Sequence, residues 1–375
     1  MTTVVTSAQE EEQYERSSLH TMLISHRDQA YEDNIAEVFN DIPFPERFNN
    51  HNLGVNKITF FGTEKDPSTD IMRFCQEVKL GQKMVAKWFN RKKSTGSMDM
   101  KLVKERGCYN ATQAQTNVAR ASLRGLSLLA DAGESLIKNT YLLVSDIKYK
   151  GVGSHGLGIG SIFLSKKVRE QLDEMSAGVG FIVEVTSYLF RLKWDDSMTE
   201  DFYTKYYTEN GPAHRDKVEA FMRDGDRWQM EYVGKTFCSS KKKNSKEAIS
   251  YPRRLLTKVT TRALDKNLAQ LQHEHPDFRI KATLVSTEPL KAYVGLKEDI
   301  TPKSRFEVLE RVIDKDGRLS YKRVGIIKPK AGRPIWDNRY MADDEDADSK
   351  LGYTEFEQVS GRDFCAGMLI RETND

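Results

Sequence analysis

Cysteine and proline are both scarce in this chain of 375 residues, which carries four cysteines and ten prolines. The cysteines stand singly, without a C-x-x-C pair or the spacing of zinc ligands, at Cys75, Cys108, Cys238 and Cys365. A disulfide-rich scaffold or a structural zinc module is therefore not indicated. Buried free thiols are the expectation, although an even count also permits one or two disulfides in an oxidising compartment.

Long apolar runs and a dominant charge sign are missing as well. No stretch approaches the roughly 18 consecutive apolar residues that cross a bilayer, so no membrane span is expected. The 58 lysines and arginines are nearly offset by 55 acidic residues, for a formal net charge of +3. This balance does not require nucleic acid as a partner. The short basic runs Arg91–Lys93 and Lys241–Lys243 also lack interleaved aromatic residues, so we expect no nucleic-acid binding.

Several catalytic signatures are absent too. The sequence has no G-x-x-x-x-G-K-[ST] phosphate loop, no H-E-x-x-H zinc motif and no G-x-S-x-G nucleophile elbow. Of the seven histidines, only His273 and His275 are close in sequence, and at the end of an expected helix they would point in different directions. No catalytic residue is therefore assigned, and the sequence favours a non-enzymatic protein.

What is present suits an α+β protein. Apolar residues are 38% of the chain and aromatic residues 10%, and the length corresponds to two or three domains of roughly 150 residues each. We expect a signal remnant and N-terminal arm over residues 1–55, with one short helix near 28–40. A mixed α/β domain should follow over 56–240, then a helical connection over 241–278 and a β-rich C-terminal module over 279–375.

Hydrophobic periodicity predicts the helices and strands of the segments 56–240 and 241–278. The pattern predicts strands at 57–62, 140–149, 179–194 and 227–237, and helices at about 69–89, 112–138, 164–176, 198–208, 212–224 and 255–271. In the strand at 179–194 the apolar phase shifts after Val185, which predicts a bulge near Thr186 and Ser187. Pro276 should stop the last helix.

The C-terminal module is read as a small antiparallel barrel or sandwich. Strands are expected at 279–286, 291–296, 305–313, 319–328 and 362–371. Asp316 and Gly317 form an Asp-Gly pair between two of these strands, which indicates a hairpin turn.

A glycine-rich loop at 151–160 offers one cofactor hypothesis. Gly151, Gly153 and Gly156 form a G-x-G-x-x-G pattern directly after a strand, as in turns that hold a dinucleotide pyrophosphate. Four residues intervene before the next helix, and no acidic residue ends the following strand, so the surroundings of the motif do not match. A nucleotide- or sugar-nucleotide-dependent enzyme using this loop is therefore an alternative to the non-enzymatic interpretation.

An acidic loop offers a second hypothesis. Asp344, Asp346, Asp348 and Glu355 have the 1, 3, 5, 12 spacing of calcium ligands in an EF-hand loop. Position 6 is Ser349 instead of the glycine that the sharp turn requires, and no paired helices flank the loop. A solvated acidic insertion is favoured, and a calcium-stabilised binding or adhesion module is the alternative.

An aromatic group near the end of the chain is a candidate partner-binding surface. Trp336, Arg339 and Tyr340 follow the rigid Arg333-Pro334 pair. They could form an exposed recognition surface, or an aromatic plug that closes the C-terminal barrel, which is the favoured alternative.

The first residues suggest export. Thr6 and Ala8 stand at the minus-three and minus-one positions of a signal-peptidase site, before an acidic segment that begins after Gln9. An ordinary frayed terminus of a cytoplasmic protein is the alternative.

Several stretches resemble a group of exported proteins of Gram-negative anaerobes that have no assigned activity. The resemblance lies in Asp99–Gly107, Arg120–Glu134, Arg323–Pro329 and Ile335–Tyr340. It implies a periplasmic or envelope location and assigns no functional residue. The order of elements is also loosely similar to that of envelope assembly factors with a small C-terminal barrel. The expected function is thus a structural or macromolecule-binding envelope component, with another envelope protein or a surface polymer as its partner.

Export makes a prediction about the mature chain. We expect protein from the envelope fraction of native cells to begin at Gln9, which intact-mass measurement would detect as the loss of residues 1–8. An unprocessed chain with four free thiols in the cytoplasmic fraction would contradict export.

Overall fold

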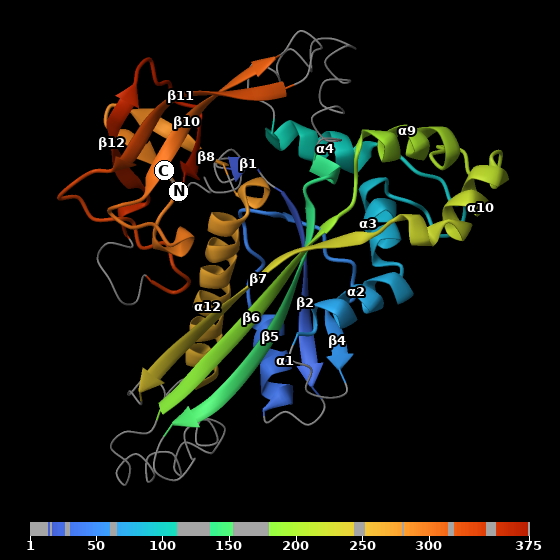
Figure 1. The fold of residues 1–375 in the computed structure, drawn as a ribbon, viewed down its shortest axis with the longest axis horizontal. Helices are drawn as coiled ribbons and strands as arrows, with labels where there is room; N and C mark the ends of the chain where they lie inside the picture. Colours follow the sequence, from blue (N-terminus) through green and yellow to red (C-terminus); the bar gives the residue numbers. More distant parts are fainter. Residues whose placement is uncertain are drawn as a thin grey trace, which may run out of the picture.

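The computed structural model of the chain describes residues 14–15, 17–26, 31–60, 66–110, 136–152, 180–243, 252–279, 281–313, 319–342 and 350–373. Its strands form a six-stranded sheet and a seven-stranded sheet (Figure 1). Helices pack on the first sheet, whereas the second closes on itself as a barrel. The predicted α+β class is confirmed.

The six-stranded sheet is mixed. Its strands are β2 (Ser18–His26), β3 (Asn49–Asn50), β4 (Lys57–Phe60), β5 (Thr140–Val152), β6 (Gly180–Leu192) and β7 (Met230–Lys243). The order is β3-β2-β5-β6-β7, with β4 also beside β2. β2 is parallel to β3, β4 and β5, while β5, β6 and β7 run antiparallel. The four strands predicted for this part of the chain are present as β4 to β7, and β7 forms one edge.

Strand β2 lies inside this sheet, in a segment that the sequence suggested was a polar arm. It is buried along most of its length, including the polar side chains of Ser18, His20 and Ser25. Because these residues interrupt the apolar pattern, neither an alternation nor a continuous apolar run marked the strand. The short helix expected in the same region is present as α1 (Glu32–Asp41).

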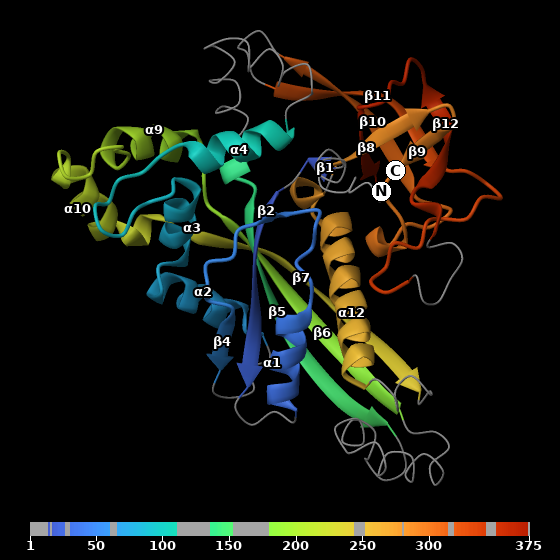
Figure 2. The same ribbon diagram turned by 180° about the vertical axis from the view of Figure 1, so that it is seen from behind.

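One face of the mixed sheet is covered by α1 and by α12 (Pro252–Glu274), which lie side by side (Figure 2). Helix α12 packs along β6 and β7, where Leu256 and Val259 share a core with Val183. The predicted helical connection is therefore a helix that completes the core of this sheet. A short 3-10 turn, η2 (Pro276–Phe278), follows it at the expected proline.

The opposite face carries further helices, namely α2 (Ser68–Glu77), α3 (Leu80–Trp88), α4 (Lys101–Asn110), α9 (Asp196–Lys205) and α10 (Arg215–Arg223). The single helix predicted over 69–89 is wrong, because Lys79 adopts a left-handed conformation with φ 52° and separates α2 from α3. The helices predicted at 198–208 and 212–224 are confirmed as α9 and α10. Asp195 caps α9, its Oδ1 accepting from the Met198 N–H at 2.8 Å.

The bulge predicted in β6 lies elsewhere. β6 pairs in continuous register with β5 through Thr186 and Ser187. The register shift falls against β7, where Val233 is the extra residue. The change of apolar phase has a different cause: β6 residues up to Val185 pack with α1 and α12, whereas from Tyr188 onward the helices of the opposite face also cover the strand.

The second sheet is an antiparallel barrel. Its strands are β8 (Lys281–Thr287), β9 (Leu290–Ala292), β10 (Arg305–Ile313), β11 (Leu319–Pro329), β12 (Thr354–Gly361) and β13 (Leu369–Thr373), and β1 (Tyr14–Glu15) adds to β8. Pairing of β8 with β9 closes the ring. The barrel alternative is thus the one that the structure adopts.

One barrel strand was misplaced by the sequence analysis. The segment predicted as a strand at 362–371 is largely a loop between β12 and β13. Asp363 and Gly367 both have positive φ angles there, of 61° and 91°. Such angles do not fit an extended strand.

Some expected elements fall outside the described residues. They are most of the helix at 112–138, the helix at 164–176 and the turn at 314–317. Among the helices that the structure does describe, none has both the length and the apolar character of a membrane span.

The cysteines match the expectation of free thiols where they are described. Cys75 and Cys238 are buried and unpaired, and Cys365 is exposed and unpaired. Burial raises the pKa of the Cys75 thiol to about 12 and that of Cys238 to about 11. Neither buried thiol is therefore poised as a nucleophile at neutral pH.

Gly81 of α3 packs closely against the backbone of Trp228. A methyl group added there would place its carbon 2.2 Å from the main-chain oxygen of Trp228. Alanine favours a helix over glycine by about 1 kcal/mol, but this clash is with backbone that cannot rotate away. We expect Gly81→Ala to lower the free energy of unfolding by about 1–3 kcal/mol in urea denaturation.

The exposed Lys83 on the same helix provides the matched control. Lys83→Ala should change stability by less than about 0.5 kcal/mol. A Gly81→Ala protein that is more stable than wild type would contradict the close approach of α3 to Trp228.

Candidate functional site

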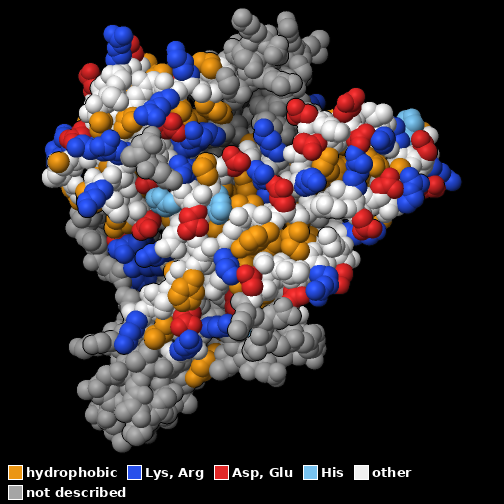
Figure 3. Space-filling view, in the orientation of Figure 1, with side chains coloured by type: hydrophobic (Ala, Val, Ile, Leu, Met, Phe, Trp, Pro, Cys, Tyr) orange, Lys and Arg blue, Asp and Glu red, His pale blue; other side chains and the backbone are white. Residues whose placement is uncertain are grey.

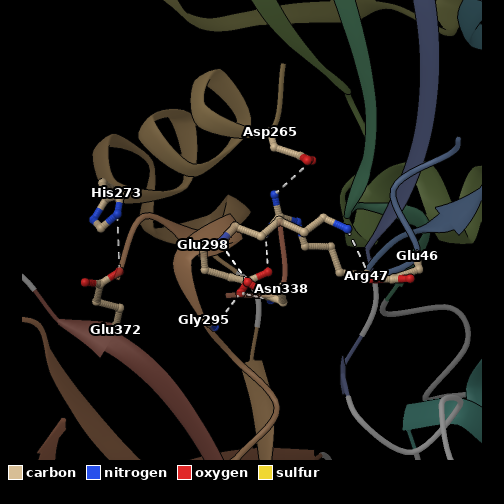
Figure 4. Close-up of polar contacts among 9 residues, drawn as sticks. Glu46, Arg47, Asp265, His273, Gly295, Glu298, Asn338 and Glu372 are labelled. Atoms are coloured by element: carbon tan, nitrogen blue, oxygen red, sulfur yellow. Dashed lines mark hydrogen bonds and ion pairs between the residues drawn. The ribbon is translucent and has the colours of Figure 1, made fainter. Parts of the chain in front are cut away.

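A buried polar network joins the barrel to the mixed sheet and positions the candidate site (Figure 4). At its centre is Glu298, in the short turn η3 (Leu296–Glu298). Its Oε1 accepts from Arg47 Nη1 at 2.7 Å, and its Oε2 accepts from the Gly295 N–H and from Asn338 Nδ2, both at 2.8 Å. Arg47 comes from the chain between α1 and β3 and is 1% exposed. Removing one partner of such a pair would leave an uncompensated buried charge, at a cost of about 3–5 kcal/mol.

Asp265 of α12 stands at the border of this network. Its Oδ1 lies 3.9 Å from Arg47 Nη2, too far for a hydrogen bond, and its Oδ2 has no partner among the described groups. Burial raises the pKa of the Asp265 carboxyl, against the opposing effect of Lys297 and Arg47. Lys297 itself is paired with Glu46 at 3.1 Å.

The network holds the barrel so that a groove forms between the barrel, α12 and β7. We call it the β7 groove, and its volume is about 560 Å³. It is lined by side chains from three elements: Lys235, Thr236 and Phe237 of β7, Gln270, His273 and Glu274 of α12, and Asp299, Thr301 and Ser304 of the barrel.

The groove lies against the free edge of β7. Thr236 faces α12, whereas Lys235 and Phe237 point to the other side of the sheet. The groove is lined by all three side chains, and a space that reaches both sides of the sheet must lie along the edge of the strand. No described strand or backbone group pairs with this edge. Two large apolar side chains of β7 are also open to solvent, Phe237 at 57% and Tyr232 at 42% exposure.

Some charged side chains of the β7 groove have ion-pair partners, and others have none among the described side chains. Lys235 is bound to Asp66 at 2.6 Å, which raises the pKa of the lysine and lowers that of the carboxyl. His273 lies 3.3 Å from Glu372, whose pKa burial raises. Glu274 and Asp299 are exposed and have no ion-pair partner among the described side chains. The groove therefore presents two available carboxylates. On the face of the molecule drawn in Figure 3, acidic, basic and apolar side chains are interspersed.

Three groups near the β7 groove are of catalytic types but lie in the wrong order. Ser304 and His273 both interact with Glu372, so the acid stands between them. In a nucleophilic triad the histidine must lie between the serine and the acid to take the serine proton. This arrangement stabilises the groove wall and does not activate Ser304.

The glycine motif is only partly described. Gly151 lies in β5, in register opposite Phe181 of β6, and so extends the strand. Gly153 and Gly156 fall outside the described residues.

The acidic motif is likewise divided. Asp344, Asp346 and Asp348 fall outside the described residues, whereas Glu355 lies in β12. Its Oε2 faces Lys330 at 3.8 Å and Arg333 at 3.4 Å. Within the described part of the chain, no group of three or more His, Cys, Asp or Glu side chains is arranged to hold a metal ion.

The aromatic group is built into the junction. The main-chain oxygen of Trp336 accepts from the Leu296 N–H at 3.0 Å, and that of Tyr340 accepts from Arg262 Nε at 2.9 Å. Arg339 binds Asp337 through two hydrogen bonds of 2.8 and 2.6 Å. All three predicted residues are partly buried, and their contacts join the barrel to η3 and α12.

Sequence comparison gives no independent guide to the site. No protein-family model matches the chain, and no curated protein has a significant match to it.

The buried carboxyl of Asp265 gives a pH-dependent prediction. Its unfolded pKa is near the ordinary 3.8, and its native pKa is higher. At a pH between the unfolded and the native pKa, unfolding releases a proton. The stability that this group contributes is therefore present below the unfolded pKa and is lost as the pH rises through the native pKa. The Asp265→Asn protein has no carboxyl group at this position, so its stability does not decrease in this way. Its free energy of unfolding relative to wild type should therefore increase from about pH 4 to about pH 7 in urea denaturation.

Leu264→Met is the control, because it changes an uncharged side chain of the same helix. Its difference from wild type should stay constant across the same pH range. A parallel pH dependence of the Asp265→Asn and wild-type proteins would show that Asp265 ionises normally in the native state.

Proposed function

We propose that this chain is a non-enzymatic, exported binding protein that takes up an extended segment of a partner polypeptide as a strand beside β7. The observation that carries the proposal is the free edge of β7 facing a groove of about 560 Å³. An edge strand presents alternate N–H and C=O groups that a single peptide strand can pair with. The envelope location is the expectation from the sequence and forms part of the same proposal.

The charge of the groove suggests what the partner segment contains. Glu274 and Asp299 lie on walls that face the strand edge, so a lysine or arginine in the segment could reach them. Phe237 supplies an apolar contact for a neighbouring side chain. An alternating segment of β-branched residues with one basic residue fits both features.

A partner peptide fits the groove better than a second copy of this chain does. The barrel residues Asp299, Thr301 and Ser304 form the far wall, which leaves room beside the edge for a strand but obstructs the edge of a whole sheet. Val233, the extra residue of the β7 bulge, also bends the strand, and bulges of this kind discourage pairing between copies.

Peptide binding can be measured directly with a designed probe. The probe is the fluorescein-labelled peptide acetyl-Thr-Val-Lys-Val-Thr-Val-amide, and the readout is fluorescence anisotropy. We expect saturable binding, weakened about fivefold or more when glutamate replaces the lysine. Two further peptides are N-methylated at alternate peptide bonds, one at the odd and one at the even positions. One of the two should not bind, because its methyl groups replace the N–H groups that pair with β7.

Two pairs of variants locate the binding on the protein. Glu274→Lys with Asp299→Lys should reverse the preference between the lysine and glutamate peptides, whereas Glu200→Lys with Asp226→Lys, on the remote α9–α10 side, should not. Phe237→Ala should weaken binding about fivefold. Met222→Ala is its control, since Met222 of α10 is similarly exposed at 52%.

The proposal fails if neither peptide binds, or if binding is insensitive to N-methylation and to the groove variants alike. A concentration-dependent dimer that Phe237→Ala dissociates would instead identify the edge as a contact between copies.

A further inference from the structure

A second recess lies on the face of the mixed sheet that α1 and α12 cover. We call it the α1–α12 pocket, and its volume is about 190 Å³. Its walls come from β2, β5, α12, α1 and the chain that follows α1. A dry protein cavity of about 150 Å³ is large enough to hold benzene. The pocket can therefore hold one aromatic ring with a small substituent.

The walls of this pocket are mostly apolar, as in small-molecule sites. Phe39, Ile42 and Phe44 close it from α1 and the chain that follows, and Leu264 and Leu268 from α12. These side chains would make dispersion contacts with a ring and keep it from water.

Most polar groups in the wall already have partners. Thr261 Oγ1 donates to the main-chain oxygen of Thr257 at 2.7 Å, and Ser145 Oγ lies 3.3 Å from Ser187 Oγ. Thr21 Oγ1 donates to Asn52 Oδ1 at 3.3 Å. These hydroxyl groups are therefore weak candidates for fixing a ligand.

Asp265 is the exception. It is 8% exposed, it lines the pocket, and its Oδ2 makes no hydrogen bond to any described group. An unpartnered buried carboxyl oxygen carries a desolvation penalty, which a ligand donor would relieve.

The rim of the pocket can be crossed from solvent. Asn40 and Asn56 are both exposed and are joined by one hydrogen bond of 3.2 Å between their side chains. An exposed side-chain hydrogen bond is readily exchanged for hydrogen bonds to water. A small molecule can therefore enter without unfolding the surrounding sheet.

We propose that the α1–α12 pocket binds a small molecule with an apolar body the size of a single ring and one O–H or N–H group, which donates to the carboxyl group of Asp265. The ring lies among Phe39, Leu264 and Leu268, and the donor end points to α12. This inference does not rest on peptide binding, because the pocket and the β7 groove share no lining residue.

Phenol and toluene test this assignment as a matched pair of probes. They have nearly the same shape, and only phenol carries a hydrogen-bond donor. We expect both to shift the same protein NMR signals, with phenol binding about fivefold or more tightly, the factor that corresponds to one hydrogen bond of about 1 kcal/mol.

Three variants assign the binding to the pocket and to Asp265. Asp265→Asn keeps the shape of the side chain and should remove most of the preference for phenol, whereas Asp299→Asn in the β7 groove should leave it unchanged. Leu264→Trp fills the pocket and should weaken both probes about tenfold or more. Leu264→Met is its conservative companion, which should fold as wild type and retain binding.

Each outcome bears on the proposal. Equal affinities for phenol and toluene in wild type, or an unchanged phenol preference in Asp265→Asn, would overturn the role of Asp265. Binding that Leu264→Trp does not weaken would place the probes outside the pocket. The absence of binding by either probe would overturn the site itself, and the peptide experiment on the β7 groove would stand or fall separately.

Discussion

The buried ion pair between Arg47 and Glu298 is the interaction on which both recesses depend. It joins the chain that follows α1 to the turn η3 of the barrel, at 2.7 Å and almost without solvent contact. Asp299 and the other barrel residues of the β7 groove come directly after Glu298 in the chain. Pro45, which closes one end of the α1–α12 pocket, lies two residues before Arg47. A buried charge pair tolerates little displacement of either partner, so it fixes the walls of both recesses together.

Helix α12 lines both recesses with different parts of its surface. Thr261, Leu264, Asp265 and Leu268 follow the three- and four-residue spacing of one helical stripe, and this stripe lines the α1–α12 pocket. The groove residues Gln270, His273 and Glu274 begin on the next turn and follow a different stripe. One helix thus separates an apolar recess with a single carboxyl from a wet groove beside exposed main chain.

Much of the fold could be predicted from local patterns, because those patterns were strong. The long strands β5, β6, β10 and β11 and the helix α12 each carry a strong apolar pattern, which in β6 changes phase after Val185. Strand β2 could not be recognised, since Ser18 and His20 are buried in a position that an apolar residue normally occupies.

The sites were harder to predict than the elements. Arg47 and Glu298 are 251 residues apart in the chain, and nothing in either local sequence indicates a buried partner. Asp265 resembles any polar position of an amphipathic helix until its surroundings are known. Two residues of the motifs that did stand out in the sequence lie in described strands: Gly151 continues β5, and Glu355 of β12 is paired with Lys330 and Arg333.

The short strand β1 belongs to the barrel, although it directly precedes β2 of the mixed sheet. Tyr14 pairs with Ala282 of the barrel, while β2, a few residues after β1, lies inside the other sheet. β1 precedes its partner strand β8 by most of the chain. Pairing over so large a sequence separation is slow, since the intervening loop must first be closed. We therefore expect β1 to pair with β8 late in folding, after the strands of each sheet that lie closer together in the chain have paired.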